Sequence, residues 1–290
     1  IVMRKTNLFL KHLKNITNFI NNVLEKNLNK LNFKNLSFLI KNNKIILTFV
    51  ALFVVFISYL LLPTFYNQKD TSKHLKNELQ SKFGLNLKFT ENIKYNIFPR
   101  PHFTSIDSSI SNNQIEFSKI KKLKVFISFD NLFSAKNIKV RDVILEKANF
   151  NLNRKNYNFF LELLNKNFKT GNLKINDSNI FYRQLENEVL LISKIYKMVY
   201  YYDTKELKNI FYSENEIFNI PFSMESFFGE DRNKFFSLIN IDLIKLKIEN
   251  ELSFENNEKI GKSQFILNRS KRTAEYQVGK NFFNFHVFDK

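Results

Sequence analysis

The longest uninterrupted apolar segment of the chain is residues 45–62, which read IILTFVALFVVFISYLLL without one charged side chain. At about 1.5 Å rise per residue, a helix of this length reaches roughly 27 Å, close to the hydrocarbon thickness of a bilayer. Lys44 precedes the segment and Pro63 follows it. The pattern therefore predicts one transmembrane helix, anchored through Ile45, Phe49, Phe53, Phe56 and Leu60.

Two other kinds of segment can produce such a run. A cleaved signal peptide would lie closer to the N-terminus and would end in small residues, whereas this segment continues into LLPTFYN. A buried helix of a soluble domain rarely needs eighteen consecutive apolar positions with no polar face. We therefore favour the membrane anchor over both alternatives.

Residues 1–44 form a basic lead in which Glu25 is the single acidic residue. Between residues 6 and 31, apolar side chains recur at helical spacing, which predicts an amphipathic helix on the membrane surface; the alternative is a polar tail, since Asn is a mediocre helix former. Lysines retained on the cytoplasmic side orient a membrane helix. Four lysines lie just before the segment, whereas the three that follow it alternate with acids, namely Lys30, Lys34, Lys41 and Lys44 against Lys69, Lys73 and Lys76. We expect a cytoplasmic N-terminus and a translocated body, residues 63–290.

Beyond the apolar segment, the chain alternates between apolar and polar positions. A short helix is expected first, over residues 72–83, between the capping sequence Asp70-Thr71-Ser72 and Gly84. Further helices are predicted at Tyr157 to Asn165 and at Lys205 to Phe211. The two-residue alternation predicts antiparallel strands with one dry and one polar face, as at Leu87 and Phe89, Tyr95 and Ile97, Leu123, Val125 and Ile127, Leu246 and Ile248, and Phe265 and Leu267. The expected fold is α+β, mostly antiparallel β, with a few short helices.

A degenerate repeat runs through the first part of this region. Asp107, Asp142 and Asp177 are separated by 35 residues, and each is followed three positions later by Ile or Leu. Because Asp side chains bond nearby backbone amides in turns, each unit is interpreted as strand, Asp turn, strand. Repeated units of this kind would build an elongated sheet; the alternative is ordinary hairpins whose spacing agrees by chance.

The formal charge of +18 and the pI near 9.7 would ordinarily favour nucleic acid as a partner. The charge is spread through a chain rich in Lys, Asn, Ile and Phe, and Arg, the preferred reader of phosphates and bases, is scarce. No tract interleaves clustered basic residues with aromatic ones. We therefore expect no nucleic-acid partner. The chain has no cysteine, which excludes disulfides and thiolate chemistry.

Candidate catalytic chemistry is sparse in the sequence. The four histidines are widely scattered and show no metal-ligand spacing, and the five glycines form no phosphate-binding loop. Glu225, Glu230 and Asp231 form a small acidic group that is best explained as a solvated loop. We expect no enzymatic activity, no metal and no cofactor.

The order of segments resembles the N-terminal region of the AsmA family. The resemblance rests on the basic lead, the single membrane helix, the helix ending in Phe-Gly, and IFPRPHFTSIDSSISN with its Pro99-Arg100-Pro101 element. KIKKLKVFISFDNLFSAKNIKVRDVILEKANFNLN, from Lys119, and GNLKINDSNIFYR, from Gly171, are similar to the blocks that follow in that family. The similarity covers roughly residues 45–185, and the remainder shows only a generic β pattern.

The resemblance implies an inner-membrane anchor carrying a periplasmic body, in a family similar to bridge-like lipid transfer proteins whose β units curl into an apolar groove. The family is associated with outer-membrane assembly and phospholipid homeostasis. On this basis the sheet is expected to be elongated and curled, with phospholipid as the partner. The predicted groove-lining residues are Leu87, Phe89, Tyr95, Ile97, Leu123, Val125 and Ile127. The same residues would equally form a closed core if the predicted helices packed on them, and the sequence leaves both arrangements open.

Two functions follow from these expectations. The first is an inner-membrane protein of the bacterial envelope that binds or conducts phospholipid along an apolar β groove. The alternative is a single-span scaffold whose β domain binds another envelope protein and moves no lipid. Carriage of lipid needs no catalytic residue. An apolar trough can bind acyl chains without specific contacts, because each buried CH₂ of a lipid contributes about 0.8 kcal/mol to the free energy of binding.

Overall fold

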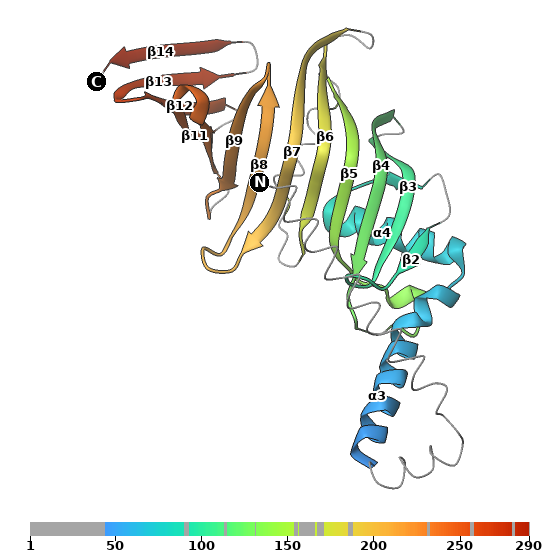
Figure 1. Cartoon of the computed structure of the whole chain (residues 1–290). Coiled ribbons are helices and arrows are strands. Elements are labelled where there is room, and N and C mark those ends of the chain that lie inside the picture. Colours follow the sequence, from blue (N-terminus) through green and yellow to red (C-terminus); the bar gives the residue numbers. More distant parts are fainter. Residues whose placement is uncertain are drawn as a thin grey trace, which may run out of the picture. The chain divides into compact units, whose positions relative to one another are not determined.

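The computed structural model describes residues 44–89, 93–112, 115–130, 132–153, 156, 166, 171–184, 188–230, 233–255, 258–279 and 282–289 (Figure 1). The chain divides into two compact units, Ile1–Tyr59 and Leu60–Lys290. The predicted amphipathic helix at 6–31 and the predicted helix at Tyr157 to Asn165 fall outside the described residues. The first unit contributes an apolar helix, and the second contributes a large sheet.

The apolar helix is α3, Lys44–Leu61. Residues Leu47–Phe65 are long and apolar enough to cross a membrane, and 11% of that stretch is buried inside the protein. A core helix of a soluble domain would be mostly covered, whereas four of the five predicted anchor side chains are exposed, namely Ile45, Phe49, Phe53 and Phe56. The fifth, Leu60, belongs to the second unit and is buried there.

A 3₁₀ turn, η1 (Leu62–Phe65), leads into helix α4, Gln68–Phe83. The predicted helix is confirmed, but it begins earlier than expected, because Asn67 and not Asp70 caps it. The Asn67 Oδ1 atom accepts hydrogen bonds from the amides of Lys69 at 2.9 Å and Asp70 at 3.4 Å. Asp70 then lies in the first turn, where a negative charge is favourable. Gly84 ends the helix with a φ of 69°.

Helix α4 is amphipathic and lies against the sheet. Thr71, Leu75, Leu79 and Phe83, on one side of the helix, are its buried side chains. Two polar side chains of α4 bind the backbone of one strand residue, since Lys82 Nζ donates to the Val140 oxygen at 2.7 Å and Glu78 Oε2 accepts from the Val140 amide at 3.3 Å. Burial lowers the pKa of Lys82. The helix is thus fixed to the sheet by both apolar packing and polar contacts.

Within the described residues, fourteen strands form one sheet in the order β1-β3-β4-β5-β6-β7-β8-β9-β10-β11-β12-β13-β14, with β2 also paired to β3. Neighbouring strands are antiparallel except β5 and β6, which are parallel. The sheet is open and curled (Figure 1), which agrees with the predicted mostly antiparallel fold. The strands are β1 (Leu87–Lys88), β2 (Lys94–Asn96), β3 (His102–Asn112), β4 (Ile115–Ile127), β5 (Val140–Leu152), β6 (Leu173–Arg183), β7 (Val189–Asp203), β8 (Lys208–Ile217), β9 (Ile220–Phe228), β10 (Lys234–Ile241), β11 (Leu246–Glu255), β12 (Glu258–Leu267), β13 (Ser270–Val278) and β14 (Phe283–Asp289).

The predicted helix at Lys205 to Phe211 is wrong. A turn joins β7 to β8 there, and β8 already begins at Lys208. The Asp203 carboxylate accepts hydrogen bonds from the amides of Lys205 at 2.7 Å and Glu206 at 3.1 Å, and this local bonding competes with a helix. Two further 3₁₀ turns, η2 (Ala135–Asn137) and η3 (Asp242–Ile244), join β4 to β5 and β10 to β11.

The predicted Asp turns are also wrong, since all three aspartates lie inside continuous strands: Asp107 in β3, Asp142 in β5 and Asp177 in β6. Asp107 and Asp177 nevertheless share an unusual backbone, with φ values of 52° and 47°, and Lys147 of β5 joins them at 55°. The strand pairings around these positions place the three in one row across the sheet. The repeat therefore marks a row of left-handed residues, with Lys147 in the place that the sequence had assigned to Asp142.

This row of left-handed residues changes which side chains face inward. A regular strand sends alternate side chains to opposite faces, but one left-handed residue shifts the alternation by one position. In β5, Leu145 and Ala148 are three residues apart, yet both are buried. Strict alternation therefore predicts the faces correctly only up to this row.

Candidate functional site

One face of the sheet, here called the apolar face, carries large hydrophobic side chains from the first strands to the last. The pairings of β9 to β12 show its continuity, because Met224, Ile239, Ile248 and Phe265 are cross-strand partners in one row. The opposite face, here called the polar face, carries charged pairs such as Lys262 with Glu275 at 3.1 Å. The polar face is mixed, because Phe227 and Phe236 also lie on it with their ring centres 5.2 Å apart.

The apolar face is filled where α4 lies on it. Leu75, Leu79 and Phe83 of α4 are fully buried. Side chains of the first strands that share this interior include Phe103, Ile110, Ile120, Val143, Leu145, Phe150, Leu173 and Ile175. This part of the face is a closed core and offers no surface to a ligand.

Four of the seven side chains predicted to line a groove lie in this closed core. Leu87, Leu123, Val125 and Ile127 are 0 to 3% exposed. The sequence left two arrangements open, a lipid groove and a closed core. These four side chains belong to the closed core, on the face of the sheet that α4 covers. Lipid contact at these residues would require α4 to move away.

The other three predicted residues, Phe89, Tyr95 and Ile97, are half-buried beside the core. Lys76 Nζ lies 5.4 Å from the centre of the Phe89 ring, and the Tyr95 ring lies 5.2 Å from that of Phe103. Tyr95 also donates a hydrogen bond from its hydroxyl to the Leu60 oxygen at 2.7 Å. These contacts give Phe89 and Tyr95 structural roles.

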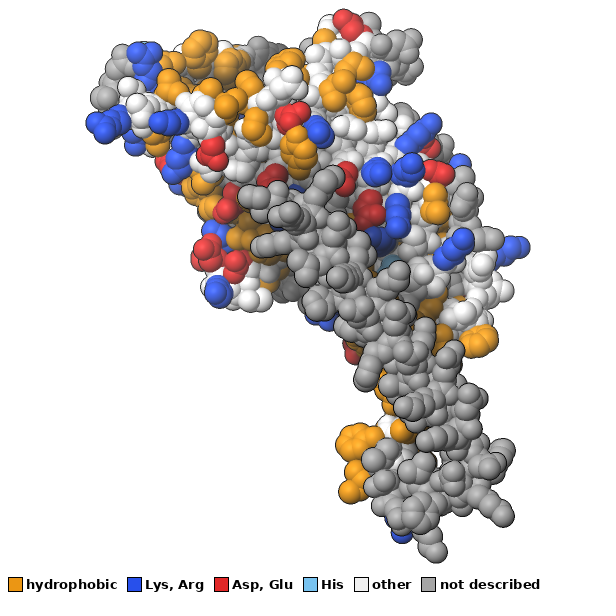
Figure 2. Space-filling view, viewed as in Figure 1, with side chains coloured by type: hydrophobic (Ala, Val, Ile, Leu, Met, Phe, Trp, Pro, Cys, Tyr) orange, Lys and Arg blue, Asp and Glu red, His pale blue; other side chains and the backbone are white. Residues whose placement is uncertain are grey.

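Beyond β8 the apolar face is uncovered by any described residue. Six of its large side chains on β11, β12 and β14 are 38 to 67% exposed, namely Phe254, Phe265, Leu267, Phe283, Phe285 and Val287. We call these six residues the open apolar patch. Figure 2 shows hydrophobic side chains gathered over the C-terminal strands. Monomeric soluble proteins rarely expose contiguous apolar surface of this kind without a binding partner.

Aromatic contacts hold the side chains of this region in place. The Phe228 ring centre lies 5.0 Å from that of Phe235 and 6.2 Å from that of Phe254. The Phe283 ring centre lies 5.9 Å from that of Phe285 and 6.4 Å from that of Tyr276. Such contacts give the surface a defined shape before any ligand arrives.

A row of small polar side chains crosses the apolar face between its large ones. Ser226, Ser237, Asn250 and Ser263 are cross-strand partners on β9 to β12. The Asn250 Oδ1 atom accepts hydrogen bonds from Ser263 Oγ at 2.7 Å and from the Tyr276 hydroxyl at 2.6 Å. Within the described part of the chain, the polar groups of Asn250, Ser263 and Tyr276 are thus bonded to one another. Removing them from water when a ligand covers the face therefore costs little free energy.

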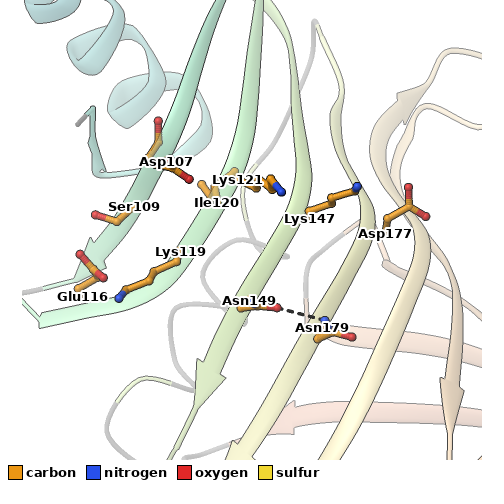
Figure 3. Close-up of a pocket in the computed structure, with 11 residues that line it drawn as sticks. Asp107, Ser109, Glu116, Lys119, Ile120, Lys121, Lys147, Asn149, Asp177 and Asn179 are labelled. Carbon is orange, nitrogen blue, oxygen red and sulfur yellow. Dashed lines mark hydrogen bonds between the residues drawn. The ribbon is translucent and has the colours of Figure 1, made fainter. Parts of the chain in front are cut away.

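A hollow of about 850 Å³ lies on the polar face, along the row of left-handed residues (Figure 3). Lys119, Lys121 and Lys147 line it together with Asp107 and other acidic and amide side chains. Asn149 and Asn179, on β5 and β6, form a hydrogen bond of 3.1 Å along its wall. The hollow carries balanced charges and no histidine or cysteine. Among the described residues, no group of three potential metal ligands is found.

The sequence pattern had included part of the open apolar patch in its alternating strands, but it had not assigned a function to it. Leu246, Ile248, Phe265 and Leu267 were expected to face one side of a sheet, and they do. The alternation Phe283, Phe285 and Val287 was the available signal for β14. Only the positions of the covering elements separate these exposed residues from the buried ones.

The fold and this face define a class of protein: an open, mostly antiparallel sheet with an exposed apolar patch, following a helix apolar enough to span a membrane. Residues 40–273 match the model of the AsmA family, and the chain belongs to that family. This confirms the resemblance seen at residues 45–185 and extends it over β7 to β12. No curated protein matches the sequence.

Proposed function

We propose that this protein is anchored in the bacterial inner membrane by α3 and that its sheet binds phospholipid in the periplasm. The open apolar patch is the observation that carries the proposal. Covering these half-exposed side chains with acyl chains is favourable and lowers the free energy by about 0.8 kcal/mol per buried CH₂. Membership of the AsmA family and the open sheet support a role at the cell envelope.

The proposed orientation places the N-terminus in the cytoplasm. Four lysines, from Lys30 to the first residue of α3, Lys44, lie on the N-terminal side of the apolar segment, whereas the three lysines that follow it are mixed with acidic residues. Retention of basic residues on the cytoplasmic side favours translocation of the sheet. Transport of phospholipid toward outer-membrane assembly is the role that this placement would serve.

Neighbouring residues of one strand offer a sharp test of lipid binding. Phe285 and His286 are consecutive on β14 and face opposite sides of the sheet, since their β13 partners are Tyr276 and Glu275. A photoreactive phenylalanine analogue at Phe285 or Phe265 of the full chain in living cells should form adducts with phospholipid upon irradiation. The same analogue at His286 should form few. Mass spectrometry of the purified adducts identifies the lipid.

Equal adduct yields at Phe285 and His286, or no lipid adduct at either apolar position, would contradict the proposal. A lipid adduct at Phe265 or Phe285 that disappears when the other position is changed to Asp would strengthen it. In contrast, Val125→Asp or Ile127→Asp should unfold the domain, because both side chains are buried in the closed core.

The scaffold alternative is favoured by one specific feature, the outer edge of β14. Among the described strands, β14 pairs with β13 alone. An unpaired edge can add a strand from another protein. Adducts of the Phe285 analogue with a protein in place of a lipid would support this second function.

A further inference from the structure

We propose that the end of the sheet next to η1 rests on the membrane surface through exposed phenylalanines, so that the sheet has a second membrane contact besides the helix. Phe65 is 84% exposed, Phe98 87%, Phe133 75% and Phe129 43%. They come from three separate segments: the turn after α3, the β2–β3 connection and the β4–β5 connection. The inference rests on the proposed anchoring of α3 but not on lipid binding by the open apolar patch.

The strand register brings two of these segments to one end of the sheet. His102 of β3 pairs with Phe126 of β4, so the β2–β3 connection meets the end of β4. The amide of Ile127 donates to the Pro101 oxygen at 3.1 Å, and the amide of Ser128 donates to the Lys139 oxygen at 2.9 Å. Phe98 and Phe133 therefore project from the same strand ends.

Hydrogen bonds attach this end to the chain as it leaves the apolar helix. The Tyr95 hydroxyl donates to the Leu60 oxygen at 2.7 Å, which links β2 to the last turn of α3. The Tyr66 hydroxyl donates to the Leu132 oxygen, which links the β4–β5 connection to the residue after η1. The stretch that is apolar enough to cross a membrane ends at Phe65. The exposed phenylalanines thus lie next to the point where the chain would emerge from the bilayer.

The charges around these phenylalanines favour a lipid surface over a protein. On the β4–β5 connection and the start of β5, Lys136, Lys139 and Arg141 are exposed, whereas Asp130 is the acidic residue exposed there among those described. Aromatic side chains with flanking basic residues are typical of segments that lie in the headgroup region of anionic bilayers. The occupant we assign to this surface is therefore the leaflet into which α3 emerges.

Residues at the opposite strand ends provide matched controls. Strands β5 and β6 start at the end of the sheet that carries Phe98 and Phe133, and β7 returns to that end, so β8 runs away from it and the β8–β9 turn lies at the other end. Phe218 in that turn is 78% exposed, and Leu243 in η3, also at that end, is 67% exposed. Exposed apolar side chains at these positions should remain in water.

The absence of cysteine makes a direct test possible in the full chain. Single cysteines are introduced as Phe98→Cys, Phe133→Cys, Phe218→Cys and Leu243→Cys, with Phe53→Cys as the membrane-embedded reference. Each variant is labelled with an environment-sensitive NBD probe and reconstituted in vesicles of phosphatidylethanolamine and phosphatidylglycerol. Quenching by lipids that carry a nitroxide near the headgroup is then measured.

The expected result is blue-shifted emission and several-fold stronger quenching at Phe98 and Phe133 than at Phe218 and Leu243. Replacing phosphatidylglycerol with phosphatidylcholine should weaken the quenching at Phe98 and Phe133. If the probes at Phe98 and Phe133 behave like that at Phe218 while the probe at Phe53 is quenched, the inference fails and the anchor stands. Blue-shifted emission without quenching at Phe98 and Phe133 would mean a protein occupant and would also overturn it. An unquenched probe at Phe53 would overturn the anchor itself.

Discussion

At the scale of single residues, the row of left-handed positions has the largest effect on the sheet. Asp107 and Asp177 adopt a conformation that Asp tolerates better than most residues, but Lys147 adopts it without such help. The Lys147 side chain is exposed, so its conformational cost is not offset by burial. The left-handed conformation of Lys147 is maintained by its neighbours in the row. Asp107 and Asp177 shift the alternation of inward and outward side chains at the same level of their own strands.

Replacing Lys147 therefore tests the strain of this row. Lys147→Gly should fold with a free energy of unfolding about 1–2 kcal/mol higher than that of Lys147→Val, because a left-handed β-branched residue is strongly disfavoured. Urea unfolding of both variants in detergent, followed by circular dichroism, measures the difference. Lys174, inside β6, serves as the control because its φ is not positive. There the Lys174→Val protein should be more stable than the Lys174→Gly protein. Equal stabilities of the two Lys147 variants would contradict a left-handed backbone at this position.

At the scale of elements, the molecule is held together by polar links between segments that are distant in sequence. The Tyr95 hydroxyl joins β2 to the end of α3, and Lys82 and Glu78 join α4 to β5. Arg100 Nη2 lies 2.9 Å from the buried carboxylate of Asp142, which also accepts from the Asn172 amide at 3.0 Å. The aspartate that the sequence had placed in a turn thus joins the starts of β3, β5 and β6.

The link made by Tyr95 predicts a pH dependence. Burial, with a smaller effect of nearby Tyr66, raises the pKa of Tyr95 from 10.0 to about 12. The folded state therefore holds this proton more tightly than the unfolded state, so the stabilisation is fully present below pH 10 and is lost as pH rises through about 12. Tyr95→Phe should be less stable at neutral pH by about 1 kcal/mol, the usual contribution of one hydrogen bond.

The same variant should also lose less stability than the wild-type protein between pH 10 and about 12. Denaturant unfolding at several pH values measures both effects. Tyr196→Phe serves as the control, because Tyr196 is an exposed tyrosine of β7. A parallel decline of the wild-type protein and Tyr95→Phe over this range would show that Tyr95 does not carry the effect.

At the scale of the whole molecule, one sheet contains two different environments. Its first strands are packed beneath α4, and its last strands leave the same face open. Surface ion pairs on the polar face, such as Lys234 with Glu251, are exposed and contribute little to stability. The stability of the sheet should therefore fall from β4 toward β14.

Hydrogen exchange can measure this gradient. In the full chain in detergent, amides of β4 and β5 should exchange most slowly and those of β13 and β14 most rapidly, because local opening costs less where fewer side chains are buried. Addition of phospholipid should slow exchange in β9 to β14 and leave β4 and β5 unchanged. Uniform exchange across the sheet, or protection by lipid only near α3, would contradict this description.

The sequence by itself determined the apolar helix, the short capped helix after it, the antiparallel strands and the family. Each of these depends on local periodicity, on capping residues or on motifs within a few positions, so neighbouring residues carry the information. The helix at Lys205 to Phe211 was mispredicted because the Asp203 side chain bonds the following amides, which the local pattern did not distinguish from a helix start.

Only the tertiary structure decided which apolar residues are core and which are surface. Leu123 and Phe265 occupy equivalent alternating positions in their strands, yet the first is buried and the second is 38% exposed. The difference arises because α4, whose sequence lies far from both, covers one end of the sheet and not the other. Alternation records that a side chain faces the apolar side, but burial depends on what packs against that side, and distant segments determine this.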